Sequence, residues 1–335
     1  MTTPVKSPKS TALLMLLLAN LLWGMSFPLV KGLALLHAML VPAAGTWFSA
    51  FYSIAPRFLI ATVILLILQA RSFWKITRAE WQQGLMIGAF LSIGMLLQND
   101  GLQFTDASTS AFLTQLYAIL IPVSLALYFR RNPGTSVWLS CLLVLAGVAI
   151  LGRFDWQDFS FGRGESETLL SSVFFMGQIL CLGWPRFANN RAEKITLVMF
   201  ASQAVIFGAL SLWSAPDLAT LVQPWTSAPW LGFTFGLTVF CTIGSFSLMV
   251  AWQPKITTTE AGLIYCVEPI FASLMALFLP YWLSRWAGFD YANETATWTL
   301  LIGGALITSA NVLIQLRPPK ISLKANLSER GRAAD

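Results

Sequence analysis

The sequence has very few charged residues for its length. Asp, Glu, Lys and Arg make up 11% of the 335 residues, whereas hydrophobic residues make up 56% and the mean hydropathy is +0.68. A soluble domain carries about a quarter charged residues. A chain this poor in charge lacks the residues to cover a surface that faces water. The composition therefore excludes an ordinary soluble protein and indicates one that lies in lipid.

Metal-binding patterns are also absent. His37 is the only histidine, and it cannot form a metal site by itself. The four cysteines lie inside apolar stretches without CxxC spacing, which is typical of small buried hydrophobic side chains. They are Cys141, Cys181, Cys241 and Cys266. We therefore expect no metal and no other cofactor.

Two further classes of protein lack their signatures. No GxxxxGK[ST] loop occurs, so the chain does not hydrolyse ATP. The net charge of +6 comes from basic residues that stand singly or in pairs between apolar stretches, with no basic stripe interleaved with aromatics. This pattern is a topology signal of membrane proteins, so the expected partner is membrane lipid and not nucleic acid.

What the sequence does contain is ten apolar stretches of spanning length, which predict an all-α integral membrane protein with ten transmembrane helices. They lie at about 11–33, 53–70, 83–102, 108–129, 136–152, 168–185, 195–213, 230–251, 259–283 and 297–316. The first stretch is too long for a typical signal peptide and is read as a membrane span.

The distribution of charge predicts the topology. With the N-terminus inside and the sides alternating, 16 of the 21 basic residues fall on the cytoplasmic side. A missed or an additional span would disturb this segregation from that point onward. We therefore expect a multi-pass protein of the cell (inner, cytoplasmic) membrane with both termini in the cytoplasm.

The chain is also predicted to be doubled. An acidic extracytoplasmic linker at 153–167 separates two units of five spans, at 11–152 and 168–316, flanked by a cytoplasmic segment at 1–10 and a basic cytoplasmic tail at 317–335. Because five is odd, the second unit enters the membrane inverted, and such repeats place a substrate site at their interface near the midplane. Thr109-Ser110-Ala111 before Pro122 and Thr259-Glu260-Ala261 before Pro269 give faint internal similarity.

Several motifs carry a resemblance to a known family. The first stretch contains Leu22-Trp23-Gly24-Met25-Ser26-Phe27 with Lys31, and the second contains Arg57-Phe58 followed by Ala61. The most specific segment runs from Gly101 to Ser108 and continues through Ala111-Phe112-Leu113-Thr114, Leu116-Tyr117 and Pro122. The penultimate stretch contains Thr259 to Ile264 and Glu268-Pro269-Ile270-Phe271-Ala272. Over about 12–316 the sequence resembles the drug/metabolite transporter superfamily, in its ten-helix EamA-type branch.

Two features depart from the family pattern. Arg130-Arg131 and Leu279-Pro280-Tyr281-Trp282 stand where the family often closes its fourth and ninth helices with a glutamate after a glycine. The segment from His37 to Tyr52 is expected to be a longer loop than usual, with an extra element on the outer face.

Polar residues at membrane depth are the candidates for a substrate site, because each costs free energy without a partner or water. In the first stretch Asn20, Trp23, Phe27 and Lys31 share one helical face. This face is either the wall of a cavity with a cationic rim or a packing surface, with Lys31 snorkelling to the interface.

Further polar residues gather toward the expected outer half of the third and fourth stretches, where they either bind a substrate or tie helix to helix. They are Gln98, Asn99, Gln103, Gln115 and Tyr117. Arg57 is expected to pair with Asp100 or Asp106, and Gln178 is a candidate ligand at the midplane.

Glu268 is the only acid that we place well inside a predicted span, and Tyr265 shares its face. A carboxylate away from bulk water is disfavoured by about 2.5–3.5 kcal/mol on insertion scales. Glu268 therefore either carries protons or balances a cationic substrate, or it bonds a neighbouring helix and serves packing alone.

The predicted function is a secondary active transporter that moves a small organic metabolite by alternating access. The resemblance implies export of an amino-acid-like or similar amphipathic compound. A passive channel or a structural membrane protein is the alternative. A membrane-embedded enzyme is disfavoured, because it needs paired acids, a histidine-rich metal site or a nucleophile with its base.

Overall fold

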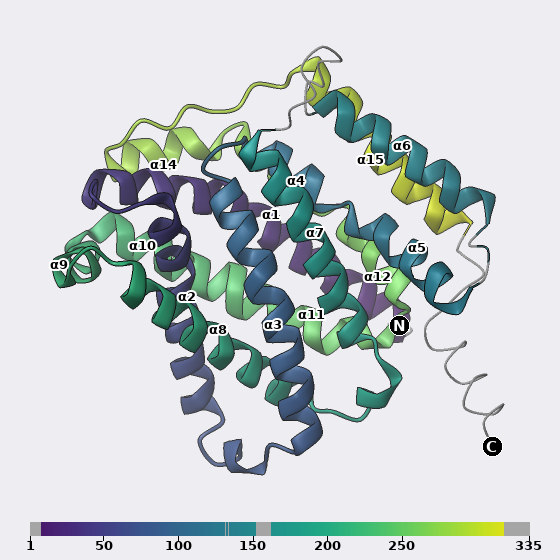
Figure 1. Cartoon of the computed structure of the whole chain (residues 1–335), viewed down its shortest axis with the longest axis horizontal. Coiled ribbons are helices and arrows are strands. Elements are labelled where there is room, and N and C mark those ends of the chain that lie inside the picture. The colour runs from purple at the N-terminus through teal and green to yellow at the C-terminus, as the bar shows by residue number, and fades with distance from the viewer. Residues whose placement is uncertain (1–7, 131, 133, 152–161, 318–335) are drawn as a thin grey trace, which may run out of the picture.

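The computed structural model describes residues 8–130, 132, 134–151 and 162–317, and it is helical throughout, with no strand among these residues. Helices occupy all ten predicted stretches (Figure 1). Their bounds are α1 Pro8–Leu40, α2 Thr46–Leu68, α3 Arg78–Gly101, α4 Ala107–Thr114 with α5 Tyr117–Phe129, α6 Thr135–Leu151, α7 Arg163–Leu182, α8 Ala192–Ser214, α10 Ala228–Gly236 with α11 Ser245–Trp252, α12 Thr258–Tyr265 with α13 Glu268–Ala276, and α15 Trp298–Leu316. Most of the predicted linker at 153–167 and of the basic tail at 317–335 lies outside the described residues.

The connections contain short helices as well. The short helix α9 (Leu218–Val222) follows α8, and α14 (Leu279–Ala287) follows α13. Single 3-10 turns lie at Phe73–Lys75, Pro185–Phe187, Gln223–Thr226 and Gln253–Lys255, and a π-helical segment, Leu237–Gly244, joins α10 to α11.

Five helical segments in the described part of the chain are long and apolar enough to cross a membrane: Lys9–Leu40, Thr46–Leu68, Ala107–Phe129, Ala192–Ser214 and Ala228–Lys255. The pair α13 and α14 would be a sixth span if its 53° bend lies within the membrane. By length and composition the molecule is thus a multi-pass membrane protein, and the total of ten spans stays a prediction.

The expected long loop from His37 to Tyr52 is wrong. The first helix continues to Leu40 and the second begins at Thr46, so both ends of this segment are helical. Side-chain contacts explain the extension: the indole Nε1 of Trp230 donates to His37 Nε2 over 2.7 Å, and His37 Nδ1 lies 3.2 Å from Ser49 Oγ. A buried imidazole bonded on both sides fixes the end of α1 against the start of α2.

The predicted ninth stretch, 259–283, also ends differently. Its helical direction ends at Ala276, and the chain then turns by 53° into α14. Pro280 lies in the first turn of α14. Because proline has no backbone N–H, it cannot donate the hydrogen bond to the carbonyl of Ala276 that would continue α13.

Helices far apart in the sequence pack in pairs. In Figure 1, α6 and α15 run side by side along one edge, and α3 lies against α7. The pair α6 and α15 is close because Gly147 has no side chain: a Cβ there would lie 2.8 Å from the carbonyl oxygen of Gly303. Small residues permit this approach in lipid, where van der Waals packing drives helix association.

Three of the helical segments are irregular near the middle of the fold. Tight turns with i to i−3 hydrogen bonds separate α4 from α5 at 115–116 and α12 from α13 at 266–267. The third irregularity is the π-helical segment Leu237–Gly244. π-Helical turns inside α-helices frequently occur at functional sites, and all three irregularities contribute to the site described below.

Candidate functional site

A cavity of about 70 Å³ lies at the centre of the fold. Its walls come from both predicted five-helix units. They are formed by Trp23, Ser26, Val30, Arg57, Met95, Gln98, Asn99, Leu102, Thr114, Tyr117, Phe175, Gln178, Ile179, Phe246, Met249, Tyr265 and Glu268. A site for one water needs roughly 10–15 Å³ by this measure, so the cavity holds a handful of small groups.

Aromatic rings form one wall of the cavity. The Trp23 indole packs edge-on against Phe246 and Tyr265, with ring centroids 5.3 and 5.5 Å apart. Tyr117 meets Tyr265 at 6.5 Å in the same geometry. Such edge-to-face pairs hold the rings in place. The wall offers a fixed apolar surface to an organic ligand.

Arg57 reaches the cavity from α2 with only 2% of its surface exposed. Its Nε donates to Thr242 Oγ1 over 2.9 Å. Thr242 belongs to the π-helical segment, so this irregularity positions the acceptor. In the described part of the chain this is the only hydrogen bond of the Arg57 side chain, which leaves its two terminal nitrogens available to a ligand.

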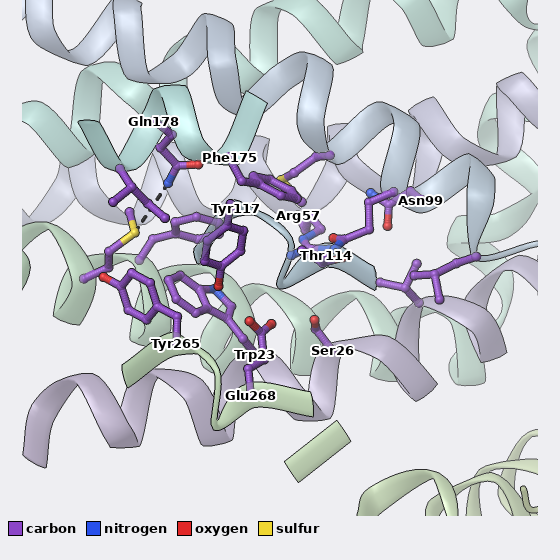
Figure 2. Close-up of a pocket in the computed structure, with 17 residues that line it drawn as sticks. Trp23, Ser26, Arg57, Asn99, Thr114, Tyr117, Phe175, Gln178, Tyr265 and Glu268 are labelled. Carbon is purple, nitrogen blue, oxygen red and sulfur yellow. Dashed lines mark hydrogen bonds between the residues drawn. The ribbon is translucent and has the colours of Figure 1, made fainter. Parts of the chain in front are cut away.

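Glu268 is the first residue of α13, directly after the turn at 266–267. Its carboxylate is buried, and Oε2 accepts a hydrogen bond from Gln115 Nε2 over 3.2 Å. Gln115 lies in the corresponding turn between α4 and α5. This bond thus joins the α4–α5 turn to the α12–α13 turn. Figure 2 shows the side chains of Tyr117 and Glu268 pointing toward each other.

Amide side chains line the rest of the cavity. Gln98 Nε2 donates to Thr114 Oγ1 over 3.0 Å, and Gln178 Nε2 donates to the Met249 sulfur over 3.4 Å. Asn99 is 3% exposed, and its Nδ2 has no hydrogen-bond partner among the described residues. An unpartnered buried donor is costly, so Asn99 has free capacity to bind a ligand.

The structure brings seven of the eleven predicted site residues to this cavity: Trp23, Gln98, Asn99, Tyr117, Gln178, Tyr265 and Glu268. Gln115 lies behind the wall and contacts the cavity through Glu268. Their role in binding stays a prediction.

The remaining three predicted residues lie elsewhere. The Asn20 amide donates to the carbonyl of Leu16 on its own helix, over 2.7 Å. Phe27 is buried in an apolar cluster with Leu33. Lys31 lies farther along α1, where its Nζ donates to the Thr105 carbonyl over 2.6 Å.

The expected ion pair of Arg57 with Asp100 or Asp106 is wrong. Asp100 pairs with Arg163, and Asp106 lies 3.5 Å from Lys31. Arg57 instead points into the cavity, so it is a site residue that the sequence analysis missed. The rule that an ionisable residue inside a span is functional by default is the signal that would have found it. Ser26, Phe175 and Met249 also line the cavity, but no sequence signal distinguishes them from packing residues.

Two larger openings lie toward opposite ends of the helix bundle. One, of about 650 Å³, is lined by Lys31, Asp106, Glu165 and Glu294 among others, and we call this end the acidic end. The other, of about 450 Å³, is lined by Lys9 and Glu260 among others, and we call it the N-terminal end. Lys9 and Lys31 both lie on α1, about 33 Å apart along the helix.

No set of three or more His, Cys, Asp or Glu side chains within the described residues could hold a metal ion. The central cavity has instead one basic group, one acidic group, amides and aromatic rings. This arrangement can bind a small organic molecule with polar groups.

Comparison with known proteins agrees with the sequence motifs. Residues 10–153 match the model of the EamA-like transporter family, which confirms the predicted resemblance. A protein of Archaeoglobus fulgidus named as an uncharacterized transporter is 24% identical over 303 residues, covering 90% of this chain and 85% of the relative. A crystal structure with 19% identity and a TM-score of 0.61 covers 92% of this chain and 97% of its own, which shows a shared fold.

Proposed function

We propose that this chain, whose residues 10–153 match the EamA-like transporter family, is a secondary active transporter of a small organic metabolite, with export as its direction. The observation that carries the proposal is the central cavity. It lies between two larger openings and combines buried ionisable groups with an aromatic wall. Buried ionisable groups at membrane depth mark substrate or ion pathways.

The pattern of helix contacts supports an inverted repeat of units 11–152 and 168–316. In such a repeat each helix of the first unit corresponds to the helix five spans later, so α1 corresponds to α7 and α3 corresponds to α11. The contact of α3 with α7 then has a counterpart in the contact of α11 with α1, and both contacts occur. Likewise α1 against α13 corresponds to α7 against α4 and α5. In two further contacts, α2 with α8 and α6 with α15, a helix packs against its own counterpart in the other unit. A two-fold axis in the membrane plane would generate this pattern.

Side-chain contacts at each end would be the gates of an alternating-access cycle. At the N-terminal end Lys9 Nζ lies 2.5 Å from Glu260 Oε1, which joins the start of α1 to the start of α12. At the acidic end Glu294 Oε1 accepts from the backbone N–H of Ala107 over 2.8 Å, which joins the segment before α15 to the start of α4. Opening one end requires breaking its contacts while those at the other end persist.

Glu268 is the proposed carrier of protons. It forms no ion pair among the described residues, and its bond to Gln115 joins the two interrupted helices. A buried acid that gains and loses a proton would change this bond, because a neutral carboxyl accepts hydrogen bonds more weakly than a carboxylate. Protonation would then be coupled to movement of α4 and α13.

Counterflow in proteoliposomes tests the proposal, after a stabilisation screen against a metabolite library has identified a ligand. A carrier gives saturable uptake that is accelerated by unlabelled substrate on the opposite side. Linear flux without such acceleration identifies a channel and contradicts the proposal.

The proton role has its own test. Glu268→Gln keeps the shape of the side chain but cannot titrate, so counterflow should persist while accumulation driven by a pH gradient is lost. Glu193→Gln, at an exposed position in the first turn of α8, is the matched control and should retain both. Full pH-driven accumulation by Glu268→Gln would exclude Glu268 as the proton carrier.

A further inference from the structure

Arg57 is a buried cation without a buried anion beside it. The ion pairs within the described residues are Lys9 with Glu260, Lys31 with Asp106, Arg163 with Asp100 and Glu167, and Arg191 with Glu80. None includes Arg57. A charge taken out of water without a partner is strongly destabilising, so an anion supplied from outside the chain is the natural partner of this guanidinium.

Glu268 does not fill this role. Its carboxylate bonds Gln115 in the turn between α4 and α5, and no ion pair joins it to Arg57 although both line the cavity. In Figure 2 the Arg57 side chain is drawn beside Thr114, and the Glu268 carboxylate is drawn beside Trp23. The carboxylate of Glu268 thus has its own partner in Gln115, and Arg57 has no charged partner among the described residues.

The geometry of Arg57 favours a planar oxyanion. Its Nε is held by Thr242, so the guanidinium is fixed in orientation before any ligand arrives. The two terminal nitrogens remain, and together they form the fork that matches the two oxygens of a carboxylate. A ligand with a single point of negative charge would use only half of this fork.

A second donor points to the same ligand. Asn99 lies on α3, lines the same cavity and has an unpartnered Nδ2. Its N–H and the free N–H groups of Arg57 are all donors, and none has an acceptor among the described residues. Independent unmet donors on two helices that face one cavity call for an acceptor between them.

We propose that Arg57 and Asn99 form an oxyanion subsite that binds the carboxylate of the transported molecule, with Thr242 as the positioning residue of Arg57. The substrate is then a small organic acid or a compound that contains a carboxylate, and its apolar part packs on the wall around Trp23. This inference deepens the proposed function. That the bound molecule is transported rests on the proposed function, whereas binding to the subsite can be tested without transport.

The test is equilibrium binding of radiolabelled propionate to the full-length protein in detergent, with propionamide as competitor. The two probes have the same shape and number of heavy atoms, and only propionate is charged. Because hydrogen bonds to charged groups are the stronger ones, propionate should bind about 10- to 100-fold more tightly than propionamide. Equal binding of the two probes, or no binding of propionate, overturns the subsite.

Variants locate the subsite. Arg57→Gln should reduce the preference for propionate to about twofold or less, and Arg57→Lys should leave an intermediate preference because the charge remains but the fork is lost. Arg285→Gln, at an exposed position on α14, is the matched control and should bind as the unmodified protein does. A full preference for propionate in folded Arg57→Gln contradicts the assignment.

Two further variants keep the test decisive if Arg57→Gln does not fold. Asn99→Asp places a negative charge of nearly the same shape in the subsite and should abolish propionate binding. Thr242→Val removes the acceptor of Arg57 Nε and should weaken propionate more than propionamide. Wild-type binding by both variants overturns the proposal. Absence of counterflow with every metabolite, together with a clear propionate preference, would count against transport and leave the subsite intact.

Discussion

The crossing of α1 and α13 at Gly24 fixes the position of Glu268, and an added methyl group tests this. A Cβ on Gly24 would lie 2.7 Å from Phe271 Cβ and 2.9 Å from the backbone nitrogen of Ala272. Carbon atoms pack at about 3.5–4.0 Å, so α13 must move by roughly 1 Å. Because backbone atoms cannot rotate away, we expect Gly24→Ala to destabilise the fold by about 1–3 kcal/mol.

The displacement should also change the cavity. Glu268 precedes Phe271 by about one helical turn on α13, so a movement of the helix carries the carboxylate with it. The 3.2 Å bond from Gln115 would then lengthen beyond hydrogen-bonding distance. We expect Gly24→Ala to lower the thermal midpoint of the purified protein and to weaken ligand binding together.

Gly208→Ala is the matched control. Gly208 lies inside α8, and apart from its chain neighbours and the backbone of its own helix no atom lies within 4 Å of its Cβ position. Alanine is the better helix former by about 1 kcal/mol, so this change should leave the midpoint unchanged or raise it. If Gly24→Ala and Gly208→Ala have the same midpoint and the same ligand affinity, the crossing does not position Glu268 and the reasoning fails.

Three further predictions follow from the fold and the cavity. Trp23→Ala should weaken ligand binding in a stabilisation assay, whereas Trp298→Ala should not, because Trp298 is 78% exposed and outside the cavity; equal losses would contradict the assigned wall. In intact cells a cysteine at Asn293 should react with an impermeant thiol reagent and one at Lys75 should not; labelling at Lys75 contradicts the inverted topology. Glu80→Gln should flatten the dependence of the unfolding free energy on pH between about 4.5 and 2.

The physical basis of the Glu80 prediction is a charge pair ahead of the predicted third span. Arg191 donates from Nε to Glu80 Oε1 over 2.7 Å, and this hydrogen bond, together with those from Thr77 and the Arg191 backbone, lowers the pKa of Glu80 from 4.5 to about 2. A lowered pKa means that the stabilisation is complete above pH 4.5 and is lost as the pH falls through 2. The effect is modest because Arg191 is partly exposed to solvent. Asp290→Asn, at an exposed position away from this charge pair, is the control.

Much of the helical fold could be predicted from hydropathy, because a helix in lipid must satisfy its own backbone groups. The rotation of each helix about its own axis could not be predicted in this way. The predicted face of α1 contained Asn20 and Phe27, whereas the cavity is lined by Trp23, Ser26 and Val30. At 100° per residue the two faces differ by roughly a fifth of a turn. The contact between Gly24 and α13 sets this rotation, and the partner of Gly24 is not visible in the sequence.

Most of the helix interruptions could not be predicted from the sequence either. Pro269 explains the turn between α12 and α13, because it has no N–H to donate to the carbonyl of Tyr265. No comparable residue stands at the turn between α4 and α5, since Pro122 lies a full turn and more beyond Gln115. The π-helical segment that positions Thr242 has no sequence signal either. These features depend on tertiary contacts that local pattern does not encode.

The three interruptions nevertheless lie at one place, and their position supports a mechanism. Gln115 and Glu268 lie at the two turns and bond each other, and Thr242 in the π-helical segment bonds Arg57. Each irregularity costs regular helical hydrogen bonds, which is tolerated at membrane depth only where protein or a hydrated cavity satisfies the freed groups. In a structural protein there is no reason for such costs to coincide around the buried acid and the buried base. In a carrier such a coincidence has a reason, because hinges at the site would let the two halves of the protein move while the bound molecule stays in contact with both.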